Sequence, residues 1–179
     1  MNDIEIIKLI FGIMLSVGAI VLFVLAYKLS YKYLIQEKRC SSNVKGIVKK
    51  YTFASRGNGI FLPVVFYNVN GKEYKVVGPE YKLYKTVTKK SSVSKNEMDF
   101  EEKDQIFTIK RTVNAYGSIY RNPMKELYPL SSEVDVYYDP SNPKLAYVLR
   151  YCDKKWTFYA LFFSAVFVLV IDLFVLFVL

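Results

Sequence analysis

The chain of 179 residues carries two long runs without a charged residue, one near each end, Leu9–Tyr27 and Trp156–Ile171. About 20 consecutive apolar residues are enough to cross the hydrocarbon core of a bilayer, and few other settings need such a run. The sequence therefore predicts two membrane-spanning helices that enclose a polar segment, Lys28–Lys155. The predicted parts in chain order are a short external N-terminus (1–8), the first membrane helix (9–30), a basic neck (31–43), a β-rich domain (44–151) with an insertion (80–130), and the second membrane helix (152–179).

The polar segment holds almost all of the charge. Of 25 Lys and Arg, only Lys8 lies outside it, and of 16 acidic residues, Asp3, Glu5 and Asp172 do. The segment therefore carries 24 − 13 = +11, against +9 for the whole chain. This excess predicts anionic partners, and because the charges cluster beside both apolar runs, anionic lipid headgroups are the first candidate.

The basic residues that flank the runs also predict an orientation. Positive charge resists translocation, so the polar segment is expected on the cytoplasmic side of a bacterial cell membrane, with both termini outside. A simple topology signal would explain the same residues without a binding role. The residues predicted to contact lipid are Lys28, Lys32, Lys38, Arg39, Arg150, Lys154 and Lys155.

A carboxylate within the second run needs a partner, because an isolated charge is costly inside a bilayer. Asp172 lies 17 residues beyond Lys155, about 25 Å along a helix. Counting in fours from Asp172 and from Lys8 gives two stripes with small residues, which let helices approach closely. We expect an antiparallel hairpin closed by a Lys8–Asp172 ion pair, unless Asp172 reaches the far surface or faces another protein. The predicted packing residues are Gly12, Ser16, Ala19, Ala160, Ser164 and Val168.

The polar segment reads as a series of short strands with turns between them. Asn70-Gly71 is the strongest hairpin signal, because a type I′ turn needs positive φ at both central positions. Pro63 favours the start of a strand or a sheet edge. A second turn contains Asp139, Pro140, Asn142 and Pro143. The predicted strands are Val44–Phe53, Ile60–Val69, Lys72–Val77, Val134–Tyr138 and Leu145–Leu149. The fold class is thus two antiparallel membrane helices flanking one small antiparallel β-sheet or β-barrel.

These segments carry a resemblance. Pro63-Val-Val-Phe-Tyr67, Asn70-Gly71 and Val134-Asp-Val-Tyr-Tyr-Asp-Pro-Ser-Asn-Pro-Lys-Leu-Ala146 resemble a bacterial membrane-anchored family, domain of unknown function 3592. The resemblance implies a small β-domain placed after or between membrane helices, and it brings no catalytic residues. The chain departs from the family pattern at Ser131-Ser-Glu133 and over Glu80–Leu130.

The insertion Glu80–Leu130 is the part most particular to this chain. Lys89–Lys95 is predicted to be a flexible linker, and Ile106–Val113 a strand or a short helix. The acidic residues between them are predicted to form a solvated charged face, because their spacing lacks the calcium-loop pattern. They are Glu97, Asp99, Glu101, Glu102 and Asp104.

Little in the sequence predicts catalysis. The chain has no histidine, which removes the usual general base, and two cysteines, Cys40 and Cys152, expected as free thiols although a pair is an alternative. We expect no metal, no cofactor and no enzymatic activity. Stacking of single-stranded nucleic acid on Tyr81-Lys-Leu-Tyr-Lys85 is a weaker alternative. The predicted function is interaction with a membrane or envelope protein. The alternatives are immunity against a membrane-acting toxin and, last, a thiol-dependent membrane enzyme.

Overall fold

The computed structural model describes residues 3–57, 59–90, 97–113 and 121–177. These residues fall into two compact units, which we describe separately. One contains residues 1–35 and 154–179, and the other residues 36–153.

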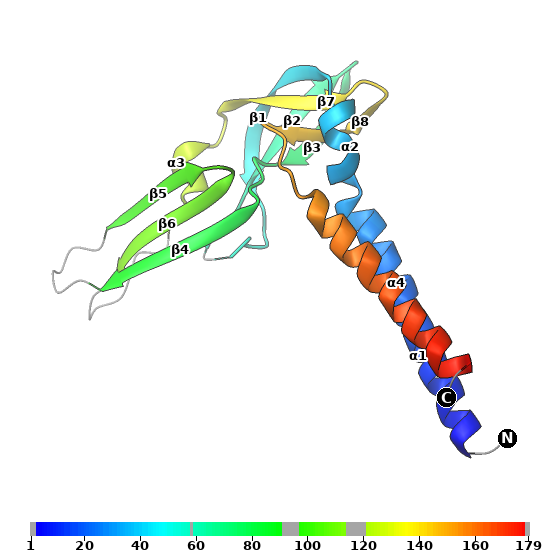
Figure 1. Cartoon of the computed structure of the whole chain (residues 1–179). Helices are drawn as coiled ribbons and strands as arrows, with labels where there is room; N and C mark the ends of the chain where they lie inside the picture. The colour runs from blue at the N-terminus through cyan, green and yellow to red at the C-terminus, as the bar shows by residue number, and fades with distance from the viewer. Residues whose placement is uncertain (1–2, 58, 91–96, 114–120, 178–179) are drawn as a thin grey trace. The chain divides into compact units, whose positions relative to one another are not determined.

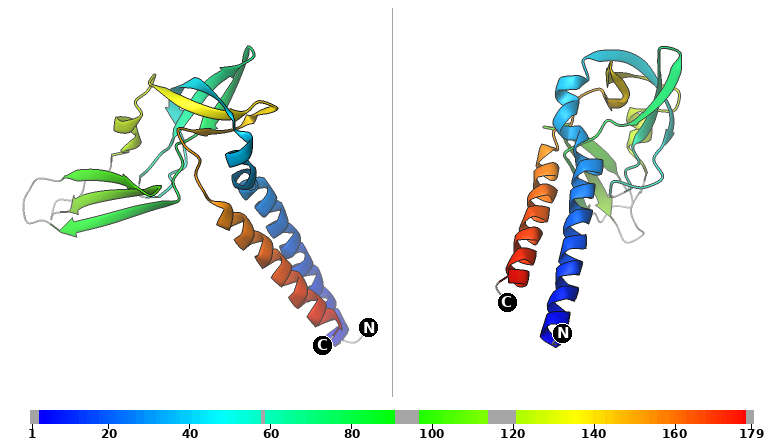
Figure 2. Two further views of the ribbon diagram at one scale, coloured as in Figure 1. Left: turned by 45° about the horizontal axis from the view of Figure 1, so that its top comes forward. Right: turned by 90° about the vertical axis from the view of Figure 1, so that its right-hand side faces the viewer.

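The first unit is a pair of long helices. α1 (Asp3–Leu25) passes through a π-helical turn, η1 (Ala26–Ser30), into α2 (Lys32–Arg39), and the C-terminal helix is α4 (Lys155–Phe177). α1 and α4 pack side by side in opposite directions, with both chain ends at the same end of the pair (Figures 1 and 2). Both are long and apolar enough to cross a membrane. The predicted antiparallel helix pair is therefore confirmed.

The helix boundaries differ from the predicted ones. Helical backbone begins at Asp3 and runs through most of the predicted neck to Arg39, whereas α4 begins at Lys155 rather than at residue 152. The π turn is closed by Tyr31 N–H, which donates to Ala26 O at 3.1 Å. A π turn inserts one extra residue, so it rotates α2 relative to the periodicity of α1.

The second unit contains a five-stranded antiparallel sheet in the order β3-β2-β1-β7-β8. β3 and β8, at the two ends of this order, also lie next to each other, so the sheet is a nearly closed barrel. This confirms the predicted antiparallel β-domain. The strands are β1 (Ser42–Tyr51), β2 (Pro63–Val69), β3 (Lys72–Val77), β7 (Glu133–Asp139) and β8 (Asn142–Val148).

The predicted turn chemistry is confirmed at two positions. Asn70 and Gly71 have φ values of 51° and 76° and join β2 to β3, as a type I′ turn requires. Pro63 is the first residue of β2, where a missing N–H costs least.

The core of the five-stranded sheet follows the alternation of its strands. Val48, Val65, Val136 and Val148 are fully buried inside it. On β8 the inward residues are Ala146 and Val148, and Leu145 and Tyr147 lie on the outer face. Gly46 fits here because a Cβ at this position would lie 2.5 Å from Val65 Cγ1.

The insertion forms a second sheet, so the prediction of one sheet was incomplete. Its order is β4-β6-β5, with β4 (Leu83–Lys90) parallel and β5 (Met98–Lys103) antiparallel to β6 (Ile106–Val113). A helical turn, α3 (Met124–Leu127), follows. Phe107 and Ile109 of β6 pack with Tyr81, Leu62 and Met124 in a separate apolar cluster.

The structure differs from two predictions made for the insertion. Lys89 and Lys90 end β4 instead of beginning a linker, while the remainder of the predicted linker, residues 91–95, lies outside the described residues. Asp99 and Glu101 alternate with Phe100 along β5, and Glu101 pairs with Lys110 of β6 at 2.7 Å on the exposed face. Glu102 points to the other side of the strand, where it accepts a hydrogen bond from Tyr81 Oη at 3.0 Å and pairs with Arg150. The predicted charged face is thus the Asp99–Glu101 side of the strand.

Candidate functional site

A mixed apolar and basic surface covers the outer side of β1, β2 and β3. Cross-strand pairing sets out two rows of outward side chains, Ile47–Phe66–Lys75 and Lys50–Val64–Val77. The pairing shifts by one residue between Val48 and Lys50, and such a bulge re-aims side chains. As a result, Lys49 and Lys50 are both exposed, although they are adjacent in sequence.

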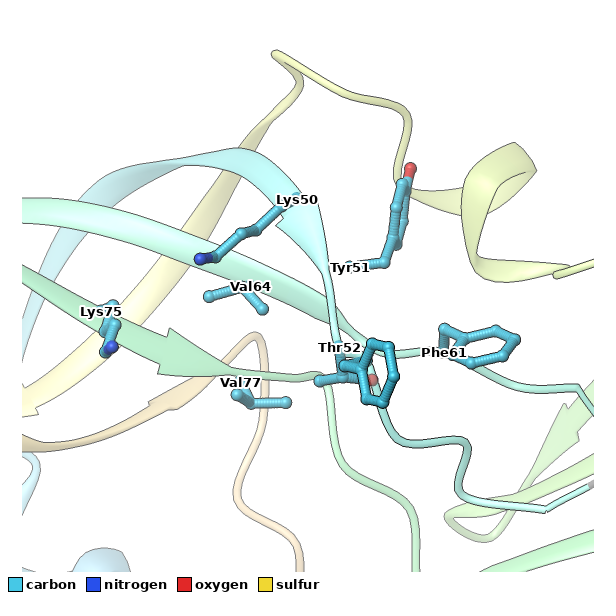
Figure 3. A pocket seen from close by; sticks show the side chains of 8 residues that line it. Lys50, Tyr51, Thr52, Phe61, Val64, Lys75 and Val77 are labelled. Atoms are coloured by element: carbon cyan, nitrogen blue, oxygen red, sulfur yellow. The ribbon is translucent and has the colours of Figure 1, made fainter.

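The second row forms the floor of a groove of about 900 Å³ (Figure 3). Val64 and Val77 lie in its middle, with Lys50 and Lys75 at one end and Phe61 at the other. Its lining residues are Lys50, Tyr51, Thr52, Phe53, Phe61, Val64, Lys75 and Val77. We call this set the outer groove.

The loop between β1 and β2 supplies the aromatic end of the outer groove. Its base is closed by Thr52 N–H, which donates to Leu62 O at 2.8 Å, and by Leu62 N–H, which donates to Thr52 Oγ1 at 3.1 Å. Phe53 lies just beyond this closure, and its side chain is fully exposed, at 102% of its reference area. Together with Phe61, Val64 and Val77 it lines one apolar hollow, and a contiguous apolar patch of this kind, unlike a single exposed residue, is typical of a contact surface.

The charges of the outer groove are available for binding. Among the described residues, neither Lys50 nor Lys75 makes an ion pair, whereas Lys49 pairs with Glu73 at 2.5 Å and lies 4.6 Å above the Phe66 ring. Lys75 also lines an adjoining hollow of about 400 Å³ together with Lys144. The arrangement suits a ligand that presents apolar and anionic side chains together.

The sequence alone does not predict the outer groove. Phe53 and Phe61 lie on either side of residues 55–59, and two aromatic residues beside an exposed loop were the available signal. Only the strand pairing showed that Lys50 and Lys75 lie beside them.

The predicted packing residues of α1 lie on the side of the helix that faces α4. Gly12 and Ala19 are buried against α4, and Ser16 is half-buried. Ser16 Oγ donates a hydrogen bond to Asp172 Oδ2 at 2.5 Å. Asp172 is itself buried, at 4% exposure.

The structure does not bring the predicted ion pair together: in the described part of the chain, Asp172 accepts a hydrogen bond from Ser16, its Oδ1 has no partner, and no salt bridge joins it to Lys8. Side chains on a helix lean toward its N-terminus. Because α1 and α4 run in opposite directions, Lys8 and Asp172 lean away from each other along the pair. The helix register, which places Leu176 beside Gly12, leaves Lys8 a further turn away.

The predicted packing face on α4 is shifted. Ala160 and Ser164 are exposed, Val168 is half-buried, and the buried small residue is Ala165. A residue turns by about 100° on an α-helix, so 12 residues leave Ala160 about 120° away from the direction of Asp172. A spacing of seven residues leaves Ala165 within about 20° of Asp172. Counting in fours therefore drifted off the face.

The predicted lipid-contact residues separate into two groups. Lys28 and Lys38 are exposed, and Lys32 and Lys154 lie 4.7 Å and 5.8 Å above the Tyr33 ring. Lys155 is half-buried at the start of α4. The two arginines are engaged with carboxylates: Arg39 pairs with Asp139 at 2.7 Å, and Arg150 pairs with Glu102 at 2.5 Å. These two side chains fasten the β-domain rather than offering free charge to lipid.

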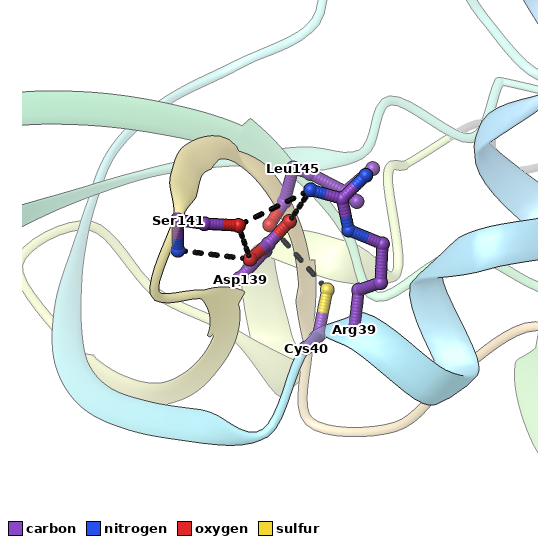
Figure 4. A network of polar contacts seen from close by, with 5 residues as sticks. All are labelled: Arg39, Cys40, Asp139, Ser141 and Leu145. Carbon is purple, nitrogen blue, oxygen red and sulfur yellow. Dashed lines mark hydrogen bonds and ion pairs between the residues drawn. The ribbon is translucent and has the colours of Figure 1, made fainter.

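The turn between β7 and β8 is a polar anchor (Figure 4). Asp139 Oδ1 accepts hydrogen bonds from Ser141 N–H at 2.9 Å and Ser141 Oγ at 2.7 Å. The hydrogen bonds from Ser141, and then the Arg39 charge, hold the pKa of Asp139 below its usual range. Tyr67 Oη donates to Pro143 O in the same turn. The exposed Pro140 and Asn142 complete it.

The two cysteine thiols are buried. Cys40 and Cys152 are both free and buried, which confirms the expectation of two free thiols. Cys40 Sγ donates to Leu145 O at 3.4 Å. Burial, and then the Asp139 charge, raise the pKa of the Cys40 thiol to about 11, so the reactive thiolate is scarce at neutral pH.

No protein-family model matches the chain, and no curated protein and no solved structure gives a significant match. The resemblance to the bacterial family of unknown function therefore stays a prediction.

Proposed function

We propose that this chain is a two-pass bacterial membrane protein that presents its basic β-domain at the cytoplasmic surface, where the outer groove binds a segment of another membrane or envelope protein. The helix pair supports the membrane anchor, because its outward faces are almost entirely apolar, and exposing so large an apolar surface to water is unfavourable. Lys28 and Lys38 supply the exposed charge for contact with anionic headgroups.

The single observation that carries the interaction role is the outer groove. Val64 and Val77 provide an apolar floor, Phe61 lies at one end, and the ammonium groups of Lys50 and Lys75 lie at the opposite end. Phe53 adds a second phenylalanine ring to the lining. Aromatic anchors in a hollow typically carry most of the binding energy of an interface, and charges at its edge select the partner. The ligand is therefore an extended segment with apolar residues at one end and Asp or Glu at the other.

A peptide-display selection on the full chain in lipid nanodiscs tests this specificity. We expect enriched peptides that combine aromatic or aliphatic residues with Asp or Glu. The double variant Lys50→Glu/Lys75→Glu should enrich basic peptides instead, while the matched variant Lys45→Glu/Lys72→Glu, also on exposed strand positions, should not. Enrichment independent of the charge at residues 50 and 75 contradicts the proposal.

Crosslinking in the native membrane then identifies the partner. A photoreactive residue at Phe53 should capture a defined membrane or envelope protein, whereas the same residue at Leu130, which is also exposed, should not. Capture of a membrane-acting toxin would assign the protein to immunity. Equal capture from both positions contradicts a role for the outer groove.

The orientation needs an engineered label, because Cys40 and Cys152 are buried. A Phe53→Cys variant is exposed and reports the side on which the β-domain lies. We expect a membrane-impermeant thiol reagent to modify it only after the cells are permeabilised. Efficient modification in intact cells would place the β-domain outside.

A further inference from the structure

The helix pair contains a buried carboxylate whose bonding is incomplete. Asp172 Oδ2 accepts the hydrogen bond from Ser16, but Oδ1 has no hydrogen-bond partner among the described residues. The residue is 4% exposed. In a bilayer, a carboxylate at this depth pairs with a donor or marks a functional contact.

Oδ1 lies against a place where α1 has no side chain. A Cβ at Gly12 would be 3.3 Å from Oδ1 and 3.0 Å from Leu176 Cδ2. Next to this point is a cavity of about 260 Å³, whose lining is apolar apart from Ser16. It is formed by Leu9, Gly12, Ile13, Ser16, Val17 and Leu176.

The cavity, the small residues and the unsatisfied oxygen occur at one level of the pair. Gly12 and Ser16 both line the cavity; Ser16 donates to Asp172, and a Cβ at Gly12 would lie 3.3 Å from Asp172 Oδ1, so a group entering beside them comes within reach of the carboxylate. Small residues also let a third helix approach closely. The chain's own Lys8 does not pair with Asp172, because its side chain leans toward the N-terminus of α1, away from the carboxylate.

We propose that this cavity receives a basic side chain, Lys or Arg, from a partner transmembrane helix, and that its charge pairs with Asp172 in the half of the bilayer farther from the β-domain. Charge complementarity selects the occupant: a cation satisfies Oδ1 and neutralises the carboxylate in the same contact. The inference rests on the proposed membrane placement, and it is independent of the outer groove.

Model peptides test the proposal without a known partner. The full chain is reconstituted in lipid vesicles with a 20-residue Leu/Ala helix that carries one Lys at the depth of Ser16, and association is followed by energy transfer. We expect the Lys peptide to associate about tenfold more tightly than the same peptide with Leu. Moving the Lys by seven residues along the peptide, or replacing it by Ser, should remove most of this preference.

Variants of the chain complete the test. Asp172→Asn keeps the size of the side chain and an acceptor for Ser16, and should abolish the preference for Lys with the helix content unchanged by circular dichroism. Gly12→Ala should weaken it by narrowing the cavity, while Gly18→Ala, whose Cβ would meet nothing within 4 Å, should leave it intact. Equal binding of Lys and Leu peptides, equal binding of Lys and Ser peptides, or an unchanged preference in Asp172→Asn would overturn the proposal. Failure of the wild-type chain to resist alkaline extraction from the vesicles would instead refute the membrane placement.

Discussion

The guanidinium of Arg39 lies 2.7 Å from Asp139 Oδ2, which joins the last residue of α2 to the turn between β7 and β8. The carboxylate is almost completely buried, at 3% side-chain exposure, while the guanidinium remains half-exposed. Cys40, the next residue, hydrogen-bonds to Leu145 O after the same turn, and Gln36 Nε2 donates to Ala146 O at 2.9 Å. The end of α2 and the residue after it are therefore fastened to the β7–β8 hairpin by contacts from three residues.

We predict that Asp139 makes the β-domain sensitive to acid. Its folded-state pKa lies below the ordinary value of 3.8, so its contribution to the free energy of unfolding is present above about pH 4 and is lost as pH falls through the folded-state pKa. Asp139→Asn should lower the urea midpoint of unfolding at pH 7. It should also make the midpoint less dependent on pH between about 5 and 3, the range in which carboxyl groups ordinarily titrate.

Asp135→Asn is the matched control for this prediction. Asp135 lies on the same strand and pairs with Lys45 at 2.7 Å, but this pair is exposed to solvent. Exposed pairs contribute little, so the variant should retain the wild-type acid profile. Similar profiles for wild type and Asp139→Asn would contradict the prediction.

Cys40 should make stability fall at alkaline pH. Its folded-state pKa of about 11 lies above the ordinary cysteine value of 9.0, so the unfolded thiol ionises first. Its contribution is complete below pH 9 and is lost as pH rises toward 11. The loss should approach about 1.4 kcal/mol per pH unit within this window.

The comparison for Cys40 is Cys40→Ser, which can keep the hydrogen bond to Leu145 O and does not ionise in this range. Urea unfolding of both proteins at each pH isolates the thiol from the titrating tyrosines. Parallel curves for the two proteins between pH 9 and 11 would show that the thiol is not protected in the folded state.

Gly46→Ala should destabilise the five-stranded sheet by about 1–3 kcal/mol, the usual range for overpacking a core. The new methyl group would lie 2.5 Å from Val65 Cγ1 and 2.9 Å from Val136 Cγ2. The double variant Gly46→Ala/Val65→Ala should be less destabilised than the sum of the single variants, because the alanine at 65 makes room. Additive losses in denaturant unfolding would argue against this clash.

Phe53→Asp should abolish peptide binding to the outer groove while changing the free energy of unfolding by less than about 0.5 kcal/mol, because Phe53 contributes no buried surface. Leu130→Asp is the control at another exposed apolar position. It should change neither quantity. A large loss of stability in Phe53→Asp would mean that the Phe53 side chain packs within the folded protein and is not free to contact a partner.

The sequence alone was sufficient for features that depend on a few neighbouring residues. The length of the uncharged runs predicted α1 and α4, because the requirement to satisfy backbone hydrogen bonds in an apolar setting acts within each segment. Asn70-Gly71 predicted the β2–β3 hairpin because positive φ is a property of those two residues. The short alternating stretch Val134–Tyr138 likewise predicted β7.

Tertiary structure decided which distant residues meet. The register of α1 against α4 places Asp172 beside Ser16 rather than Lys8. This contact depends on the opposite directions of the two helices and on their 3.6 residues per turn, and no local sequence pattern specifies how the two helices align. The second sheet escaped prediction because β4 and β5 are rich in polar residues and gain their stability from β6. The outer groove likewise exists only once β1, β2 and β3 are paired, because strand register, and not sequence spacing, brings Lys50 and Lys75 to the same surface as Phe61.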